Sequence, residues 1–424
     1  MSKRLPADVD PCAEEARKGQ SLPLATARAQ ILEAVNPVSG DETQALTEAL
    51  DRVLSEDVYS DVDVPSHNNS AMDGFAVAAS DLPADGDRVF AVAGTAWAGH
   101  PYTGEVTTGQ CVRIMTGATV PAGLDTVVMQ EHVRADGDNA VIAAGHRPGQ
   151  HVRQAGEDVH AGDLAVAAGT RISAAHVGLL ASLSVPAVRV RRRPRVAFFS
   201  TGDELRPIGT PLGPGQIYDS NRYSLGAMLA RLNLEPLDMG VVRDDPAALE
   251  AALSAAAAEA DAIITTGGVS VGAADHVTET LARLGSVGFW KVAMKPGKPI
   301  AFGRIADALF FGLPGNPVSV MATFYQLVQP ALERLRGIAR PAPPVFLRAR
   351  CSDRLRKRPG RIEFQRGVLE HEGDGRYTVR GVGHQGAGVL RSMADANCFI
   401  VLPAEQDEVA AGSEVMVQPF AGLI

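Results

Sequence analysis

A glycine-rich turn between an apolar strand and a helix constrains the fold of this chain more than any other segment. Ala262-Ile-Ile264 leads into Thr265-Thr-Gly-Gly-Val-Ser270, and Asp275 then opens a segment whose apolar residues have helical spacing. Glycines let a ligand approach the backbone, and the unpaired N–H groups and dipole of a helix N-terminus favour negative charge. The segment therefore predicts an anion site, with Gly267, Gly268 and Ser270 as candidate binding residues.

Predicted strands and helices alternate around this turn, from residue 195 to residue 336. Apolar runs predict strands, and apolar residues at i, i+3, i+4 and i+7 or a capping residue predict helices. The expected strands are 196–199, 237–242, 262–264, 289–294 and 309–312, and the expected helices are 219–232, 245–256, 275–284 and 318–336. This alternation predicts a doubly wound, mostly parallel sheet, whose ligands bind at the carboxyl ends of the strands.

Acidic residues follow three of these predicted strands. Glu204 ends Ser200-Thr-Gly-Asp-Glu204, Asp244 follows the next strand, and Asp275 follows the glycine-rich turn. Asp275 and Asp244 can each be simple helix caps. If the sheet is parallel, however, all three acids meet at one edge, where a single Mg²⁺–phosphate site would explain them together. Both interpretations stay open from the residues alone.

Two further segments supply candidate ligand contacts. Lys291, Lys295 and Lys298 lie in Trp290-Lys-Val-Ala-Met-Lys-Pro-Gly-Lys-Pro299, and lysines are compact charges suited to a phosphate or an oxyanion. The alternative is a solvated edge strand. Pro314-Gly315-Asn316-Pro317 joins a strand to a helix and would place backbone N–H groups near a ligand, although it is also ordinary turn chemistry.

The flanking segments have a different texture. Residues 1–20 are polar, 24–35 and 42–53 have helical spacing, and residues 174–181 form another expected helix. Between 61 and 153, turn residues separate short β-like runs at 89–92, 111–115, 126–130 and 140–143. A proline-rich linker at 340–344 precedes a second β-like region. We therefore expect several domains, as the length of 424 residues also requires.

Composition excludes several function classes. The net charge of −9 favours neither nucleic acid nor an anionic membrane as a partner. The four cysteines are far apart and predict neither a zinc site nor a disulfide framework. No apolar run is long enough to cross a membrane, and residues 1–12 do not resemble a secretory signal. We expect a cytoplasmic protein. Walker A and G-x-G-x-x-G motifs are missing around the turn, which disfavours ATP hydrolysis and NAD chemistry.

An ordered set of short motifs resembles a known family. NSAMDGFAV, RIMTGATVP, VVMQE, GEDV, STGDEL, IYDSNR, TTGGVSVG, MKPGKP and LPGNPVS follow one another from about residue 22 to the C-terminus. Together they resemble the molybdopterin molybdenumtransferases (the MoeA family), which are related to the E domain of gephyrin. Any one motif is weak, but the ordered set is specific.

The resemblance implies a fold with five segments. These are a 1–20 extension, a discontinuous linking domain (21–60 with 154–192), an inserted β-rich domain (61–153), a molybdopterin-binding α/β domain (193–340) and a C-terminal β-barrel-like domain (341–424). It also implies an elongated homodimer with the active site between subunits. Molybdopterin adenylyltransferase and molybdoenzymes are implied as further partners.

The implied reaction joins molybdate to adenylylated molybdopterin, releases AMP and requires Mg²⁺. The resemblance makes Glu204, Asp244, Asp275, Lys291 and Lys295 active-site residues, with the three acids near the metal. The residues implied to act from the other part of the molecule are Asp73, Thr116 and Asp158. Arg366 is a weaker ligand-binding match. Ala387 stands where relatives often have Ser, which puts a hydroxyl contact there in doubt.

Two alternative functions stay open at this point. A molybdopterin adenylyltransferase shares the α/β domain and the Gly-Gly-x-Ser turn, but the flanking β regions and the MKPGKP segment weigh against it. A gephyrin-like binding scaffold is the alternative from a different class. The sequence contains no dedicated scaffold region beyond the short N-terminal extension.

Overall fold

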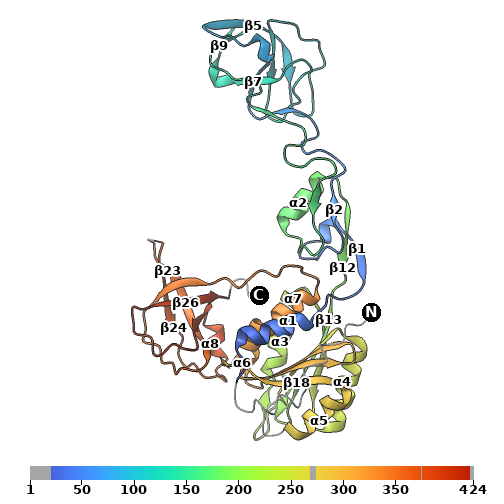
Figure 1. Cartoon of the computed structure of the whole chain (residues 1–424), viewed down its shortest axis with the longest axis vertical. Helices are drawn as coiled ribbons and strands as arrows, with labels where there is room; N and C mark the ends of the chain where they lie inside the picture. Colours follow the sequence, from blue (N-terminus) through green and yellow to red (C-terminus); the bar gives the residue numbers. More distant parts are fainter. Residues whose placement is uncertain (1–20, 268–273, 374, 421–424) are drawn as a thin grey trace.

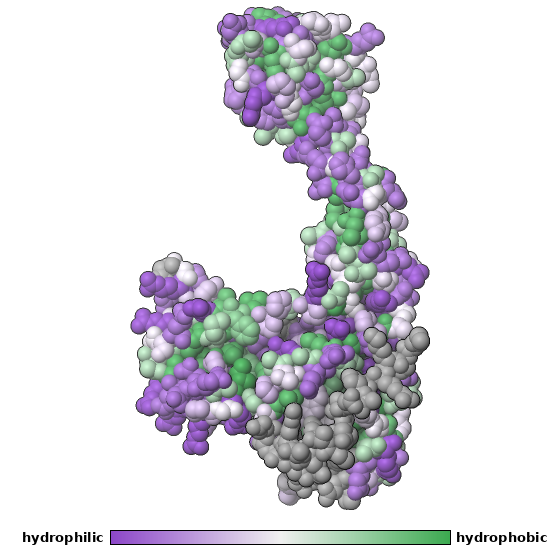
Figure 2. Space-filling view, viewed as in Figure 1, coloured by the Kyte–Doolittle hydropathy of each residue, from purple (hydrophilic) through white to green (hydrophobic). Residues whose placement is uncertain are grey.

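The computed structural model describes residues 21–267, 274–373 and 375–420, and for 274–278 it describes the backbone only. Figure 1 shows an elongated molecule in which a narrow neck joins a β-rich part to a linking part, an α/β part and a C-terminal barrel. The space-filling view in Figure 2 shows open solvent between the β-rich part and the barrel. Within the described residues, no helix has the length and apolar character needed to span a bilayer.

The α/β part is built on a six-stranded sheet. In spatial order its strands are β16 (Glu235–Val242), β13 (Arg195–Thr201), β17 (Ala262–Thr266), β21 (Ala308–Leu313), β20 (Pro299–Ile305) and β18 (Gly285–Lys291). The first four strands are mutually parallel, and β18 shares their direction because both it and β21 pair antiparallel with β20. The predicted mostly parallel sheet is therefore confirmed, with β20 as the exception.

Helices cover both faces of this sheet, because successive strand residues point to opposite sides. Phe198 and Ile264 share one core with α1 (Leu24–Ala34), α3 (Ser220–Arg231), α6 (Pro317–Thr323), the π-helix η5 (Phe324–Val328) and α7 (Gln329–Leu335). Phe199 and Ile263 share the other core with α4 (Pro246–Glu259) and α5 (Ala274–Leu284). The sheet is doubly wound, as predicted.

The β-rich part contains a second six-stranded sheet. Its strands, in spatial order, are β7 (Thr126–Met129), β4 (Gly74–Val77), β6 (Gln110–Ile114), β5 (Asp87–Ala96), β9 (Asn139–Ala143) and β8 (Val133–Asp136). A small apolar cluster packs on each face of this sheet. The short antiparallel pair of β3 (Asn69–Ser70) with β10 (Val152–Arg153) lies where the chain enters and leaves this part.

The linking part consists of short ladders and one helix. The strand β1 (Asp41–Ala45) pairs with β12 (Ala187–Arg191), β2 (Val58–Tyr59) pairs with β11 (Leu164–Val166), and α2 (Ala174–Ser182) packs beside them. The helix expected over 42–53 is wrong. Only the 3-10 turn η2 (Leu46–Glu48) forms there, because the residues before it pair as β1 with β12 and Asp51 adopts φ +62°. The apolar residues whose spacing suggested a helix instead pack into the small core of the linking part.

The C-terminal part is a closed five-stranded barrel. Its order is β23 (Ile362–His371), β24 (Tyr377–Gly381), β22 (Leu347–Cys351), β26 (Glu414–Pro419) and β25 (Cys398–Leu402), which returns to pair with β23. The short helix α8 (Arg391–Ala394) precedes β25. The strand expected over 289–294 is split: β18 ends at Lys291, and β19 (Met294–Lys295) pairs with β23 of the barrel. This segment therefore connects the α/β part to the barrel.

Candidate functional site

The carboxyl ends of β13, β17 and β21 form the edge on which the predicted site lies. Gly267 follows β17 with φ +84°, and a Cβ added there would lie 2.4 Å from the carbonyl oxygen of Thr201. A side chain at this position would therefore have to push the turn away from β13. Gly268 and Ser270 lie outside the described residues. The close approach of the turn to β13 is possible only because residue 267 is glycine.

The N-terminus of α3 reaches the same edge, which the sequence reasoning did not predict. Asp219 is 1% exposed and caps the helix: its Oδ1 accepts hydrogen bonds from the Arg222 N–H at 3.2 Å and from Ser200 Oγ at 3.0 Å. Asn221 Nδ2 donates to the carbonyl oxygen of Gly315 at 2.7 Å. The motif IYDSNR contained these residues, and an Asp before an amphipathic helix was the signal that could have identified the cap.

The acidic residues lie on neighbouring loops of this edge. The N–H of Asp244, after β16, donates to Asp203 Oδ1 at 3.3 Å, which joins the loops after β16 and β13. Glu204 folds back over Gly202, where an added Cβ would lie 2.6 Å from its Oε2. The Asp275 side chain lies outside the described residues. Among the described side chains, no group of three or more His, Cys, Asp or Glu could hold a metal, so the three-acid metal set stays a prediction.

The lysine segment lies at the joint between the sheet and the barrel. Lys291 ends β18, and both Lys291 and Lys298 are exposed. Lys295 Nζ lies 3.2 and 3.3 Å from the two carboxylate oxygens of Glu363 on β23. Glu363 is 4% exposed at its side chain, whereas Lys295 is 48% exposed. One buried carboxylate of the barrel therefore holds a half-exposed ammonium group from the other part of the chain.

Arg366 is buried in the barrel and supports a loop. Its side chain is 1% exposed, and it donates to Ser392 Oγ at 3.0 Å and to the carbonyl oxygens of His384 and Gly386 at 3.3 and 3.1 Å. Burial lowers the pKa of its guanidinium to about 10. The structure places this residue behind the 384–387 loop, and direct ligand binding by Arg366 stays a prediction.

That loop packs against the Pro314-Gly-Asn-Pro317 turn. The N–H of Val318, in the first turn of α6, donates to the carbonyl oxygen of Ala387 at 3.0 Å. A backbone carbonyl makes this contact, so the replacement of a serine by Ala387 leaves it intact. The barrel therefore closes one side of the edge where Pro314, Gly315, Asn316 and Pro317 lie.

Two other predicted residues meet in the β-rich part. Asp73 Oδ1 accepts hydrogen bonds from both the N–H and the Oγ1 of Thr116, each at 2.7 Å. The backbone bond, the hydroxyl bond and the charge of Arg113 together lower the pKa of the exposed Asp73 carboxyl. Asp158 is also exposed, near the neck, where its N–H donates to Val64. Figure 1 and Figure 2 show this part far from the sheet edge, so one chain does not bring the two residue sets together.

Comparison with protein families covers nearly the whole chain. Residues 22–184 match the MoeA N-terminal region (domain I and II), residues 197–334 match a probable molybdopterin binding domain, and residues 348–420 match the MoeA C-terminal region (domain IV). The three matches follow one another in the order in which the linking and β-rich parts, the α/β part and the barrel occur.

Individual relatives agree with this result. A protein of Haemophilus influenzae named molybdopterin molybdenumtransferase is 43% identical over 404 residues, covering 95% of this chain and 100% of the relative. A protein of the same name from Nostoc is 40% identical over 374 residues, covering 86% of each chain. The crystal structure of the molybdopterin biosynthesis moeA protein from Pyrococcus horikoshii superimposes with a TM-score of 0.81 at 29% identity, covering 94% of this chain and 100% of that one. The chain therefore belongs to the MoeA family.

Proposed function

We propose that this protein is a molybdopterin molybdenumtransferase, a transferase that inserts molybdenum during molybdenum cofactor biosynthesis. Its substrates would be molybdate and adenylylated molybdopterin, and its products molybdenum cofactor and AMP. The observation that carries this proposal is full-length similarity to relatives of that name. The strand-end edge, with its glycine turns, acids and lysines, supports it.

The chemistry requires two anions to approach each other. Lys291, at the end of β18, and Lys295, beside Glu363, would reduce the repulsion between molybdate and the phosphoanhydride and stabilise negative charge on the leaving phosphate. The glycine-rich turn that begins at Gly267 and the N-terminus of α3 would favour the same charge through their backbone N–H groups. These residues would bind and orient the substrates, and the barrel loop would cover one side of them.

The acids of the edge fit Mg²⁺. This ion prefers one or two carboxylates, with water and substrate oxygens completing its shell. The exposed carboxylates of Glu204 and Asp244 lie on loops joined by a hydrogen bond, and Asp275 lies in the first turn of α5. These three residues would hold the ion, which would offset the charge of the phosphate oxygens when bound.

We further propose that the protein works as a homodimer. Asp73, Thr116 and Asp158 are family-matched site residues, yet their part of the chain lies far from the sheet edge. A second copy would supply them across the subunit interface. Contacts with a molybdopterin adenylyltransferase and with molybdoenzymes, and the cytoplasmic location, stay predictions of the sequence.

The activity is tested by incubating the purified chain with adenylylated molybdopterin and Mg²⁺, with and without molybdate. We expect molybdate-dependent AMP release that needs no ATP. AMP release at the same rate with and without molybdate would reject the proposal. ATP-dependent adenylylation of molybdopterin would instead support the alternative function, molybdopterin adenylyltransferase.

Mixed dimers test the shared site. Asp73→Asn and Glu204→Gln chains should each be nearly inactive alone. If each site takes residues from both copies, a 1:1 mixture should recover about a quarter of the wild-type rate, because half of the dimers then contain one intact site. No recovery in a mixture shown to contain mixed dimers would contradict the two-subunit site.

A further inference from the structure

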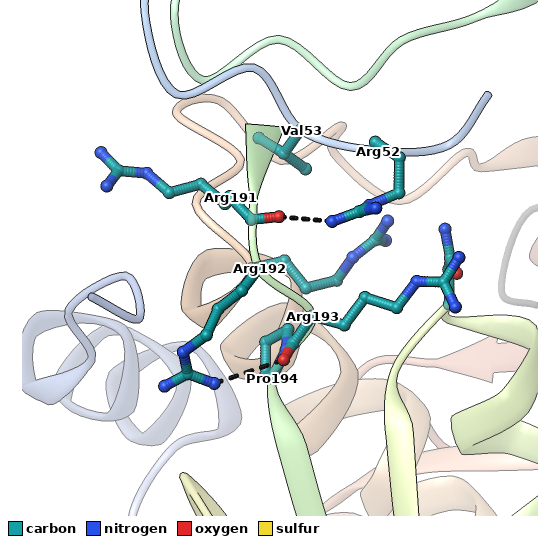
Figure 3. Close-up of a pocket in the computed structure, with 8 residues that line it drawn as sticks. Arg52, Val53, Arg191, Arg192, Arg193 and Pro194 are labelled. Atoms are coloured by element: carbon teal, nitrogen blue, oxygen red, sulfur yellow. Dashed lines mark hydrogen bonds between the residues drawn. The ribbon is translucent and has the colours of Figure 1, made fainter. Parts of the chain in front are cut away.

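Arginines gather around a small cavity at the opposite edge of the α/β sheet. The cavity lies where the linking part meets the amino end of β13, which begins at Arg195. Figure 3 shows Arg52 and Arg193 on one side of the segment 191–194, while the side chains of Arg191 and Arg192 extend to its other side. The residues lining the cavity are Arg52, Val53, Arg191, Arg192, Arg193, Pro194, Asn233 and Arg336.

Three of these arginines already have carboxylate partners. The pairs are Arg52 with Glu42, Arg191 with Asp41, and Arg192 with Asp261. The last pair is a two-pronged contact, in which separate guanidinium nitrogens donate to the two carboxylate oxygens at 2.6 and 2.8 Å. Each of these three arginines therefore already contacts a carboxylate, and Asp41 is shared between Arg191 and Arg189.

The other two arginines lack such a partner among the described residues. Arg336 is 5% exposed, and its guanidinium donates to the backbone carbonyl oxygen of Asp51 at 2.5 Å. Burial and the nearby charges of Arg171 and Arg52 lower its pKa to about 10, against the opposing effect of Glu333 and Asp51. Arg193 is exposed, and within the described part of the chain its side chain makes no hydrogen bond or ion pair. Burying a guanidinium without a countercharge is costly.

We propose that this cavity binds a tetrahedral oxyanion, such as phosphate or sulfate, between Arg193 and Arg336. The planar guanidinium fork matches the oxygens of such an anion. Arg52 adds a third guanidinium, 3% exposed, and Asn233 adds an amide. The anion is the countercharge that Arg336 lacks, and the site is separate from the one at the carboxyl ends of the strands.

The position of the site gives the anion a structural consequence. Arg52 belongs to the linking part, Arg336 follows α7 of the α/β part, and Arg193 lies in the segment that joins them. One anion held by all three would tie the two parts together. Because only the native arrangement forms the site, the anion would stabilise the folded protein in proportion to its concentration.

Titration calorimetry with inorganic phosphate and with sulfate, at constant ionic strength, tests the proposal. The decisive variant is Arg193→Gln, since this exposed side chain can change without disturbing the core. Losing a charged donor should weaken binding of the anion about tenfold or more. Arg336→Gln should weaken it further if the variant folds, and Arg193→Gln alone decides if it does not.

Arg189→Gln is the matched control. This arginine lies on β12 near the cavity, pairs with Asp41 and is half exposed, but it does not line the cavity. Its removal should leave anion affinity within about twofold, because a screened charge outside a site contributes little. The proposal would be overturned if the wild-type protein showed no saturable binding of phosphate or sulfate. It would also be overturned if Arg193→Gln and Arg189→Gln lost affinity equally.

Discussion

Replacing Arg366 with Met separates two roles for this residue, loop support and direct ligand binding. Methionine keeps an unbranched apolar stem but removes three hydrogen bonds to Ser392, His384 and Gly386. Buried bonds to a charged donor contribute about 1.5–3 kcal/mol each, and relief of the desolvated charge and entry of water offset part of the loss. We therefore expect a local destabilisation of about 3 kcal/mol, near the upper end for single substitutions.

Hydrogen exchange with mass spectrometry measures this effect where it should occur. Peptides spanning residues 382–392 should exchange about a hundredfold faster in Arg366→Met, because each 1.4 kcal/mol changes an opening equilibrium about tenfold. AMP release should fall in parallel, since the loop packs against the turn before α6. Arg348→Met, an exposed arginine of the same barrel paired with Glu414, should change neither. Unchanged exchange combined with lost activity would refute loop support and favour direct ligand contact.

Three further substitutions test the site. Thr116→Ala should raise the lowered pKa of the Asp73 carboxyl toward its ordinary value. The stabilisation that the contact gives the folded protein is present above the ordinary pKa of the carboxyl and is lost as the pH falls through its lowered pKa. An unchanged titration of the Asp73 carboxyl by NMR would exclude the Thr116 hydroxyl as a cause. Glu363→Gln should lower the rate of molybdate-dependent AMP release about fivefold, because it removes the partly exposed ion pair with Lys295. Glu363→Asp should recover part of that rate. A wild-type rate in Glu363→Gln would contradict a role of Glu363 in positioning Lys295. Gly267→Ala should reduce the affinity for adenylylated molybdopterin more than Gly215→Ala does. Gly215 has a similar positive φ, but a Cβ added there meets open space. Equal losses of affinity would show that backbone strain alone matters.

Local patterns predicted the elements that frame the site. Asp245 and Pro246 predicted the start of α4, and the Asp245 side chain does accept a hydrogen bond from the Ala248 N–H at 2.9 Å. Such caps depend on residues three apart, which is why the sequence is sufficient to find them. The 42–53 helix failed for the opposite reason, because the pairing of β1 with β12 outweighed local spacing. The expected domain boundaries stay predictions.

The sequence by itself predicted most strands and helices of the α/β part, its mostly parallel sheet and membership of the MoeA family, but it missed β20 and misassigned residues 42–53. Hydrophobic period, capping residues and motif order are all properties of consecutive residues. Only the tertiary structure decided which distant groups meet, such as the Lys295 ammonium with the Glu363 carboxylate and the Asn221 amide with the backbone carbonyl of Gly315. It also showed that Arg336 is buried beside other arginines. Contacts between distant residues depend on register and packing, and no local pattern specifies them.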